Sequence, residues 1–166
     1  MGPRFLIDGM LGRLCRKMRM LGYDCELAGK GRSPYLLLDA ENAGRTAVTT
    51  ATRRLDRIGP PAVVLRRSGA AEMIAELFAN LGMDPQFAPF TLCLECNAPL
   101  GEIAREKITG RLPPRILRDF KEFHECAECG RIYWKGSHYE AMERYIESII
   151  ERLRGEGLDP VIGDKA

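Results

Sequence analysis

The stretch RFLIDGMLGRLCRKMRMLG, residues 4–22, decides the fold. It opens with a short apolar run that ends at Asp8-Gly9, and this pattern predicts a strand followed by a turn. Apolar residues then recur at helical spacing until Gly22, which predicts an amphipathic helix that stops at the glycine. The apolar positions of this helix are Leu11, Leu14, Cys15, Met18 and Leu21.

The same alternation of strand and helix signals continues to residue 81. Apolar or β-rich runs predict strands at residues 23–27, 46–50 and 62–65. Helical spacing predicts helices at residues 33–43, opened by Ser33-Pro34, and at residues 70–81, each followed by a glycine. Strand–helix alternation favours an α/β sandwich with a mostly parallel sheet and right-handed crossovers.

The composition is that of an ordinary folded protein. The 166 residues are 45% hydrophobic and 29% charged, which excludes a disordered chain and a collagen-like chain. No apolar run approaches the roughly 18 residues of a membrane span, and the first residues contain no apolar signal core. We therefore expect a cytoplasmic protein without a membrane segment.

The formal charge of +2 is unevenly distributed along the chain. Residues 1–90 contain 13 Lys and Arg against 9 Asp and Glu, whereas residues 91–166 contain 12 against 14. The first half is thus mildly basic. This excess is typical of a surface that faces RNA or phosphate, and equally of an ordinary solvated surface.

A change in composition near residues 82–92 predicts a domain junction, because two prolines interrupt the chain there and no helical period is present. We expect an α/β domain at residues 1–90, a cysteine-containing part at 91–155 and a loose tail at 156–166. The second part would end in a helix with an apolar stripe, opened by a capping box at residues 137–140.

Four of the six cysteines form two Cys-x-x-Cys pairs with 29 residues between them. The paired residues are Cys93 with Cys96, and Cys126 with Cys129. Two tight turns of this kind bring four thiolates to one ion, and this donor set suits a structural Zn²⁺ in a ribbon. An iron–sulfur cluster and a pair of disulfides are the alternatives.

The residues around these pairs fit two metal-binding turns. Asn97 and Gly130 directly follow the second cysteine of each pair, where the chain needs left-handed backbone. His124 and His138 lie nearby but are not needed as ligands when four thiolates are present. A four-thiolate site has no open position for water, so we expect it to hold the fold rather than to catalyse a reaction.

Asp8 is the candidate active-site residue. It follows a predicted strand and precedes a predicted helix, and in a parallel sheet this is the edge at which functional sites collect. Its carboxylate is suited to hold Mg²⁺ or Mn²⁺ through oxygen. The competing interpretation is that Asp8 only caps the helix that follows.

Basic residues follow several of the predicted strands. Arg13, Arg16 and Lys17 share one face of the first helix, and further basic residues come after the third and fourth strands. These are Arg53, Arg54 and Arg57, and then Arg66 and Arg67. Together they would form a basic rim for RNA phosphates at one sheet edge, or an ordinary solvated face.

Two motif blocks resemble the Mut-seven-C RNase domain family. The first is FLIDGMLGRL at residues 5–14 with MRMLGYD at residues 18–24, and the second is CLECN at residues 93–97 with CAECGRIYWKGSH at residues 126–138. The resemblance covers residues 4 to about 150. It implies a PIN-like, three-layer nuclease domain with a C-terminal zinc ribbon, which cleaves RNA with divalent metal ions held by a cluster of acids.

The chain departs from this family at two acid positions. Relatives have acids just before the second helix, where this chain has SPYLL at residues 33–37. Relatives also have a Thr-Arg-Asp motif after the third strand, where this chain has TTAT at residues 49–52. Asp8 is the family acid that carries over, while Asp39, Glu41 and Asp56 lie outside the family pattern.

These departures yield two hypotheses about function. The first is a PIN-like ribonuclease that acts on RNA through a divalent-metal site at Asp8, with catalysis weakened or lost because one aspartate cannot by itself hold two ions. The second is a non-catalytic zinc-ribbon protein that binds RNA or a ribonucleoprotein.

Overall fold

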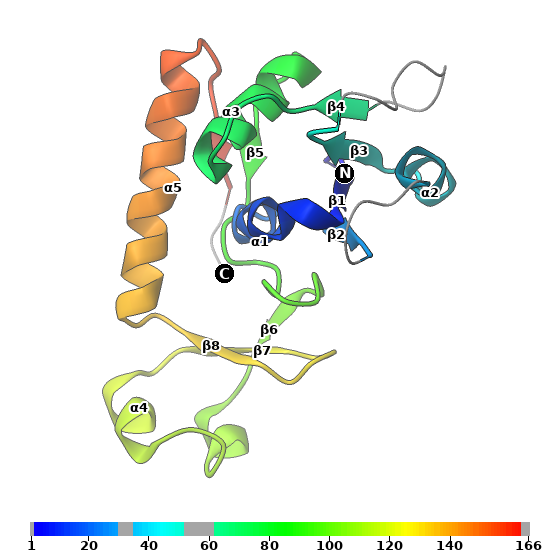
Figure 1. Cartoon of the computed structure of the whole chain (residues 1–166). Coiled ribbons are helices and arrows are strands. Elements are labelled where there is room, and N and C mark those ends of the chain that lie inside the picture. The colour runs from blue at the N-terminus through cyan, green and yellow to red at the C-terminus, as the bar shows by residue number, and fades with distance from the viewer. Residues whose placement is uncertain (1, 30–34, 52–61, 164–166) are drawn as a thin grey trace.

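The chain is described by a computed structural model that covers residues 2–29, 35–51 and 62–163. Its N-terminal half is built on a four-stranded sheet in the order β2-β1-β3-β4, in which every neighbouring pair is parallel (Figure 1). The strands are β1 (Phe5–Asp8), β2 (Cys25–Ala28), β3 (Thr46–Thr49) and β4 (Ala62–Val64). The predicted α/β class with a mostly parallel sheet is therefore confirmed.

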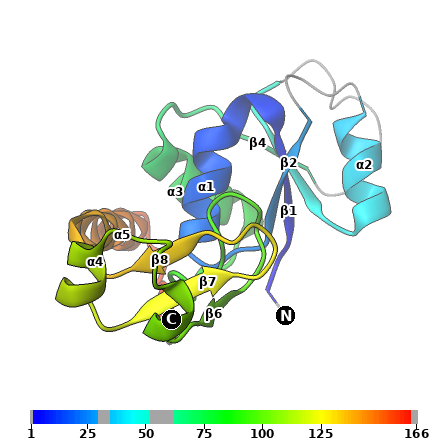
Figure 2. The same cartoon turned by 90° about the horizontal axis from the view of Figure 1, so that it is seen from below.

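Helices cover both faces of this sheet. Seen from below, α1 (Gly12–Met20) and α3 (Ala70–Leu81) lie on one side, and α2 (Leu36–Ala43) lies on the other (Figure 2). Alternate side chains of β1 serve the two layers, because successive residues of a strand point to opposite faces. Phe5 and Ile7 belong to the large core with α1 and α3, whereas Leu6 belongs to a smaller core with α2.

The turn after α1 requires a glycine. Gly22 has a φ of +91°, and a Cβ atom at this position would lie 2.2 Å from the carbonyl oxygen of Ala88. The close approach is fixed by backbone bonds from Ala88 N to Leu21 O at 3.0 Å and from Phe90 N to Met20 O at 3.1 Å. The segment that leaves the sheet domain is thus attached to the end of α1.

The C-terminal half contains a separate three-stranded antiparallel sheet. Its strands are β6 (Leu100–Glu102), β7 (Phe123–Cys126) and β8 (Ile132–Trp134), in the order β6-β7-β8. A 3-10 helix, η2 (Arg105–Ile108), and a short helix, α4 (Pro114–Asp119), lie between β6 and β7. The sequence analysis predicted none of these short elements.

The long helix α5 (Ser137–Gly155) runs back to the first half and packs on α3 (Figure 1). Its buried residues Ile146, Ile149 and Leu153 belong to the same core as Phe5 of β1. The predicted capping box does not form, because Gly136 is the N-cap and makes no side-chain cap bond. The helix start is instead closed by backbone bonds from Tyr139 N and Glu140 N to Gly136 O.

The segment predicted as a loose tail, 156–166, contains a strand. Within its described part, β9 (Val161–Ile162) pairs in parallel with β5 (Gln86–Phe87). The pairing rests on backbone bonds, such as Gly163 N to Phe87 O at 2.7 Å. Val161 and Ile162 remain largely exposed, so no burial pattern in the sequence marks them as a strand. Within the described residues, no helix is both long enough and apolar enough to span a membrane.

Candidate functional site

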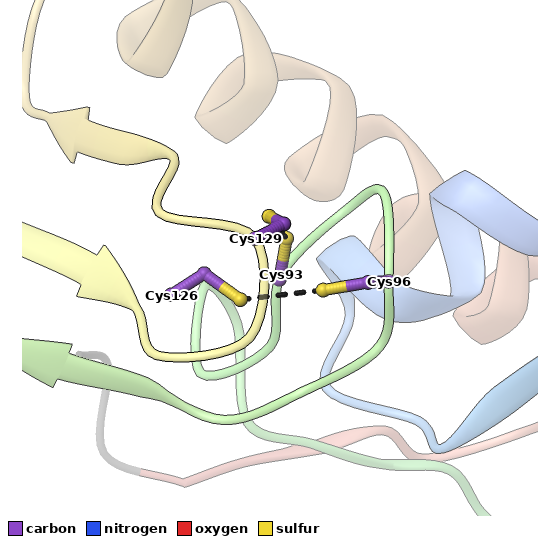
Figure 3. Close-up of side chains that lie close together, drawn as sticks. All are labelled: Cys93, Cys96, Cys126 and Cys129. Carbon is purple, nitrogen blue, oxygen red and sulfur yellow. Dashed lines mark hydrogen bonds between the residues drawn. The ribbon is translucent and has the colours of Figure 1, made fainter.

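The four paired cysteines meet at one point between the two halves of the chain (Figure 3). Their Sγ atoms all lie within 4.8 Å of one another, although the pairs come from separate loops. Cys93 Sγ is 3.7 Å from Cys129 Sγ, and Cys96 Sγ is 3.2 Å from Cys126 Sγ. A tetrahedral zinc site with Zn–S bonds of about 2.3 Å sets its sulfurs about 3.8 Å apart, so the cluster has the size of a site for one ion.

Each Cys-x-x-Cys pair forms the same tight turn. Asn97 N donates to Cys93 O at 3.0 Å, and Gly130 N donates to Cys126 O at 2.8 Å. The φ angles of Asn97 and Gly130 are 70° and 67°, which confirms the left-handed backbone predicted at both positions. These turns point both sulfurs of a pair toward the same centre.

The electrostatics of the cluster favour a bound cation. Burial opposes ionisation of Cys93, but hydrogen bonds from Tyr133 and from the backbone of Cys96 lower the pKa of its thiol to about 6. The backbone N–H of Ala98 favours ionised Cys96, but the sulfurs of Cys126, Cys93 and Cys129 together with desolvation outweigh it and raise the pKa of Cys96 to about 12. The four thiols therefore do not all ionise until a bound cation compensates the negative charge of the thiolates.

The donor set fits a structural metal. All four cysteines are free thiols, and their Sγ–Sγ distances exceed the 2.05 Å of a disulfide. His124 and His138 do not belong to the cluster. The Tyr133 hydroxyl lies 3.1 Å from Cys93 Sγ and orients this ligand from outside the metal's own coordination shell.

The first metal-binding turn is also bonded to the parallel sheet. The side chain of Asn97 accepts a bond from Cys25 N, at the edge of β2, at 3.0 Å, and it donates to the Asp24 carboxylate. Arg19, which is only 7% exposed, donates to the carbonyl oxygens of Leu94 and Glu95 within the turn. The loop that holds Cys93 and Cys96 is therefore attached to the first residue of the edge strand β2.

The hydrogen bonds of Asn97 and Arg19 between the first metal-binding turn and the sheet were not predicted from the sequence. Arg19 was visible only as a charge between Met18 and Met20, both of which are buried. A cation inside an apolar helix face indicates a partner, but it does not say where along the chain that partner lies.

Asp8 ends β1 at the carboxyl edge of the sheet and is 4% exposed. Its Oδ1 accepts from Met10 N at 3.1 Å, and its Oδ2 accepts from the Thr49 hydroxyl at 2.7 Å. Thr49 ends β3, the neighbouring strand, and its hydroxyl also accepts from Ala51 N at 3.1 Å. The carboxylate thus caps the 3-10 turn η1 (Gly9–Leu11) and links two strand ends.

The structure does not assemble an acid cluster around Asp8 within the described ranges. Across residues 2–29, 35–51 and 62–163, the four cysteines are the one group of three or more His, Cys, Asp or Glu side chains close enough to share an ion. Asp39 and Glu41 are exposed on α2, and Asp56 lies outside the described residues. Among the described residues, Asp8 is therefore not part of a carboxylate cluster of the kind that a two-metal site needs.

The predicted basic rim separates into residues with different surroundings. Arg13 is exposed on α1. Arg16 forms an ion pair with Glu95, and the Lys17 ammonium lies 3.9 Å from the centre of the Tyr145 ring. Burial lowers the pKa of Lys17. Arg53, Arg54 and Arg57 lie outside the described residues.

The basic residues after β4 surround a carboxylate. The backbone N–H groups of Arg66 and Arg67 both donate to Glu76 of α3, at 2.9–3.0 Å. The Arg67 side chain forms an ion pair with Glu156. Arg67 is therefore already neutralised in part by an acid of the same chain.

Comparisons with known proteins identify the family. Neither the search of curated proteins nor the search of solved structures gives a match. A family model described as Mut7-C RNAse domain matches residues 3–146, which spans the parallel sheet, the four cysteines and the first turns of α5. The chain therefore belongs to the Mut7-C RNAse domain family.

Proposed function

We propose that this protein is an RNA-binding member of its family in which metal-dependent cleavage at Asp8 is weak or absent. Membership of the family supports a nuclease-like or RNA-related role. The observation that carries the proposal is the Asp8 carboxylate, which is buried, bonded to Met10 and Thr49, and without a cluster of acids among the described residues.

The chemical argument concerns charge. A two-metal nuclease places two divalent ions about 3.5–4 Å apart, and several carboxylates must offset their charge. Here a threonine hydroxyl stands beside Asp8, where it supplies a proton donor rather than a second negative charge. Loss of metal stabilisation of the transition state costs several kcal/mol, which corresponds to several orders of magnitude in rate.

The same lack of acids favours binding of an intact RNA. An acid-poor sheet edge repels phosphates less than a complete nuclease site does without its ions. The excess of basic residues in residues 1–90 adds a favourable field. We propose Arg13 as a direct phosphate contact and Arg16, Lys17, Arg53 and Arg54 as further RNA contacts.

We propose that the four-cysteine cluster holds one structural Zn²⁺. Four cysteine sulfurs within 4.8 Å of one another match the donor set of closed structural zinc sites. Free thiols that must stay reduced to bind metal also suit the cytoplasm. When bound, the ion would neutralise the thiolates and connect the two metal-binding turns, while Tyr133 and Arg19 hold the first of these turns in place.

A combined binding and cleavage assay tests this function. Binding of a fluorescently labelled single-stranded RNA is followed by anisotropy, and its cleavage in Mn²⁺ is followed on a gel, for the zinc-loaded protein and for Asp8→Asn. We expect both proteins to bind RNA and neither to cleave it. Because the asparagine amide would face either Met10 N–H or the Thr49 hydroxyl, the melting temperature of the variant is measured alongside.

Variants of basic residues supply the specificity control. Arg13→Ala should weaken binding and flatten the slope of log affinity against log salt by about 0.7, the value for one phosphate contact on a single strand. Arg115→Ala, an exposed arginine on α4, is the matched control for a general loss of charge. Mn²⁺-dependent cleavage that disappears in Asp8→Asn would establish a ribonuclease instead, and absence of RNA binding would overturn the proposal.

A further inference from the structure

An apolar pocket lies where the linker, the antiparallel sheet and α5 meet. The segment at residues 90–92, strand β8 and helix α5 each contribute two of its wall residues, and β6 and β7 contribute Leu100 and His124. They are Phe90 and Leu92 of the linker, Tyr133 and Trp134 of β8, and Tyr139 and Met142 of α5. The site described above uses only one of these residues, Tyr133, through its bond to Cys93.

The aromatic wall is held rigidly. The Phe90 and Tyr139 ring centroids are 4.3 Å apart with an interplanar angle of 35°, so the two rings contact each other as a tilted pair. Phe90 has a φ of 64°, an unfavourable conformation for a bulky side chain, and its backbone is fixed by the bond from Phe90 N to Met20 O. The backbone of Phe90 therefore adopts an unfavourable φ, and this conformation places the Phe90 ring against Tyr139 in the pocket wall.

The mouth of the pocket is polar and carries a cation. Lys135 lines the pocket with its ammonium 6.0 Å from the centre of the Tyr139 ring and 2.8 Å from the Glu122 carboxylate. Lys135 and His124 also line a second, wider hollow next to it, together with Lys121. The two hollows thus share His124 and Lys135, and the wider one contains two lysines and two acids, Glu102 and Glu122.

We propose that this pocket binds one nucleobase of a single-stranded RNA and that the sugar–phosphate chain leaves over Lys135 into the neighbouring hollow. Aromatic side chains accept the flat face of any base, and lysines next to them neutralise the adjoining phosphate. The proposal rests on the RNA-binding function argued above. It adds a second contact region, separate from the edge of the parallel sheet that contains Asp8.

Glu122 makes the proposal sharper. Its carboxylate forms an ion pair with the Lys135 ammonium, so an incoming phosphate must compete with Glu122 for this lysine. Removing this negative charge should therefore strengthen RNA binding. A protein partner that inserted an apolar side chain would not respond in the same way to the charge of Glu122.

The protein contains a built-in reporter for this pocket. Trp134 is the only tryptophan of the chain, and it lines the pocket. A zinc-loaded sample is titrated with an oligouridylate of about eight nucleotides, a length within the range of one single-strand site. Trp134 emission and the anisotropy of the labelled RNA are recorded together. We expect quenching that saturates with the same dissociation constant as the anisotropy, and no quenching by ribose 5-phosphate, which has no base.

Substitutions connect the signal to the pocket. Tyr139→Ala should weaken RNA binding about 5- to 150-fold, the range for loss of one base-stacking contact, whereas Tyr139→Phe, which keeps the ring, should bind normally. Lys135→Gln should weaken binding and Glu122→Gln should strengthen it. Glu151→Gln is the control, because this exposed acid lies 12 residues along α5 from Tyr139, about 18 Å away.

The outcomes separate this inference from the function on which it rests. RNA binding by anisotropy with unchanged Trp134 emission and no effect of Tyr139→Ala would overturn the pocket while the RNA-binding function stands. If Tyr139→Ala does not fold, the opposite effects of Lys135→Gln and Glu122→Gln decide the question. Absence of any RNA binding would overturn both proposals.

Discussion

The contact between the first metal-binding turn and the parallel sheet can be tested at Asn97. Its Oδ1 accepts from the backbone N–H of Cys25, a residue that is completely buried at the edge of β2. Asn97→Ala leaves this N–H without a partner, which costs about 1–3 kcal/mol. Alanine must also adopt the φ of 70°, which adds about 1–2 kcal/mol. We therefore expect a loss of about 2–5 kcal/mol in the free energy of unfolding.

This loss is large for a protein of this size. Natural domains have total stabilities of about 5–15 kcal/mol, so the variant would lose a substantial fraction. For a chain of this length, each 1 kcal/mol changes the melting temperature by about 2–4 °C, which predicts a decrease of about 4–20 °C. Asn97→Gly removes the same side chain but tolerates the left-handed backbone, so it should be more stable than Asn97→Ala by up to about 1 kcal/mol.

Urea unfolding at a fixed, saturating concentration of Zn²⁺ measures these differences, since zinc binding would otherwise contribute to the apparent stability. Hydrogen exchange of the Cys25 amide locates the effect, because this amide should lose protection in both variants. A stability within about 0.5 kcal/mol of wild type, the range of neutral surface substitutions, would refute the reasoning. So would an unchanged exchange rate at Cys25.

Three further predictions concern a glycine turn, an ion pair and the antiparallel sheet. Gly22→Ala should lose about 2–5 kcal/mol in urea unfolding, because its Cβ would meet the Ala88 carbonyl; Gly82→Ala, at a φ of +61° with open space around it, should lose only about 1–2 kcal/mol. Burial raises the pKa of Asp24, but the hydrogen bond and charge of Arg45 hold this pKa below its usual value. The stability from this pair is therefore complete above the unfolded pKa near 4 and is lost as the pH falls through the lower folded pKa; in Arg45→Gln a pH series of melting temperatures should show a weaker acid dependence. Chelation of zinc should abolish amide protection in the antiparallel sheet before it does so in the parallel sheet, as followed by hydrogen exchange.

The sequence predicted the elements whose signals are local. The helix expected at residues 70–81 has these bounds as α3, because an apolar stripe defines its face and Gly82 ends it in left-handed backbone. The four parallel strands lie within one or two residues of their predicted positions, since each is a short apolar run. The two-residue strands β5 and β9 have no such signal, because they pair through backbone groups and β9 stays exposed.

The candidate sites were predictable to different extents. Cysteine spacing alone indicated one cluster able to hold a metal ion, because two turns of fixed geometry determine where four sulfurs lie. Position after a strand indicated Asp8, but its environment depends on Thr49, which is 41 residues away along the chain. The pocket beside Trp134 has even less of a local sequence signal, because its walls come from segments that meet only in the folded protein.

The metal centre has a structural influence beyond its own ligands. On one side, Asn97 and Arg19 connect its first turn to the edge strand β2. On another side, Tyr133 bonds to Cys93 and also forms a wall of the aromatic pocket. A bound ion that fixed Cys93 would therefore act, through short hydrogen-bonded contacts, on both the attachment to β2 and the position of a pocket wall. The four cysteines would thus support the proposed base pocket without a catalytic role, because Leu94 lies in the first turn and Tyr133 bonds to Cys93, and both line that pocket.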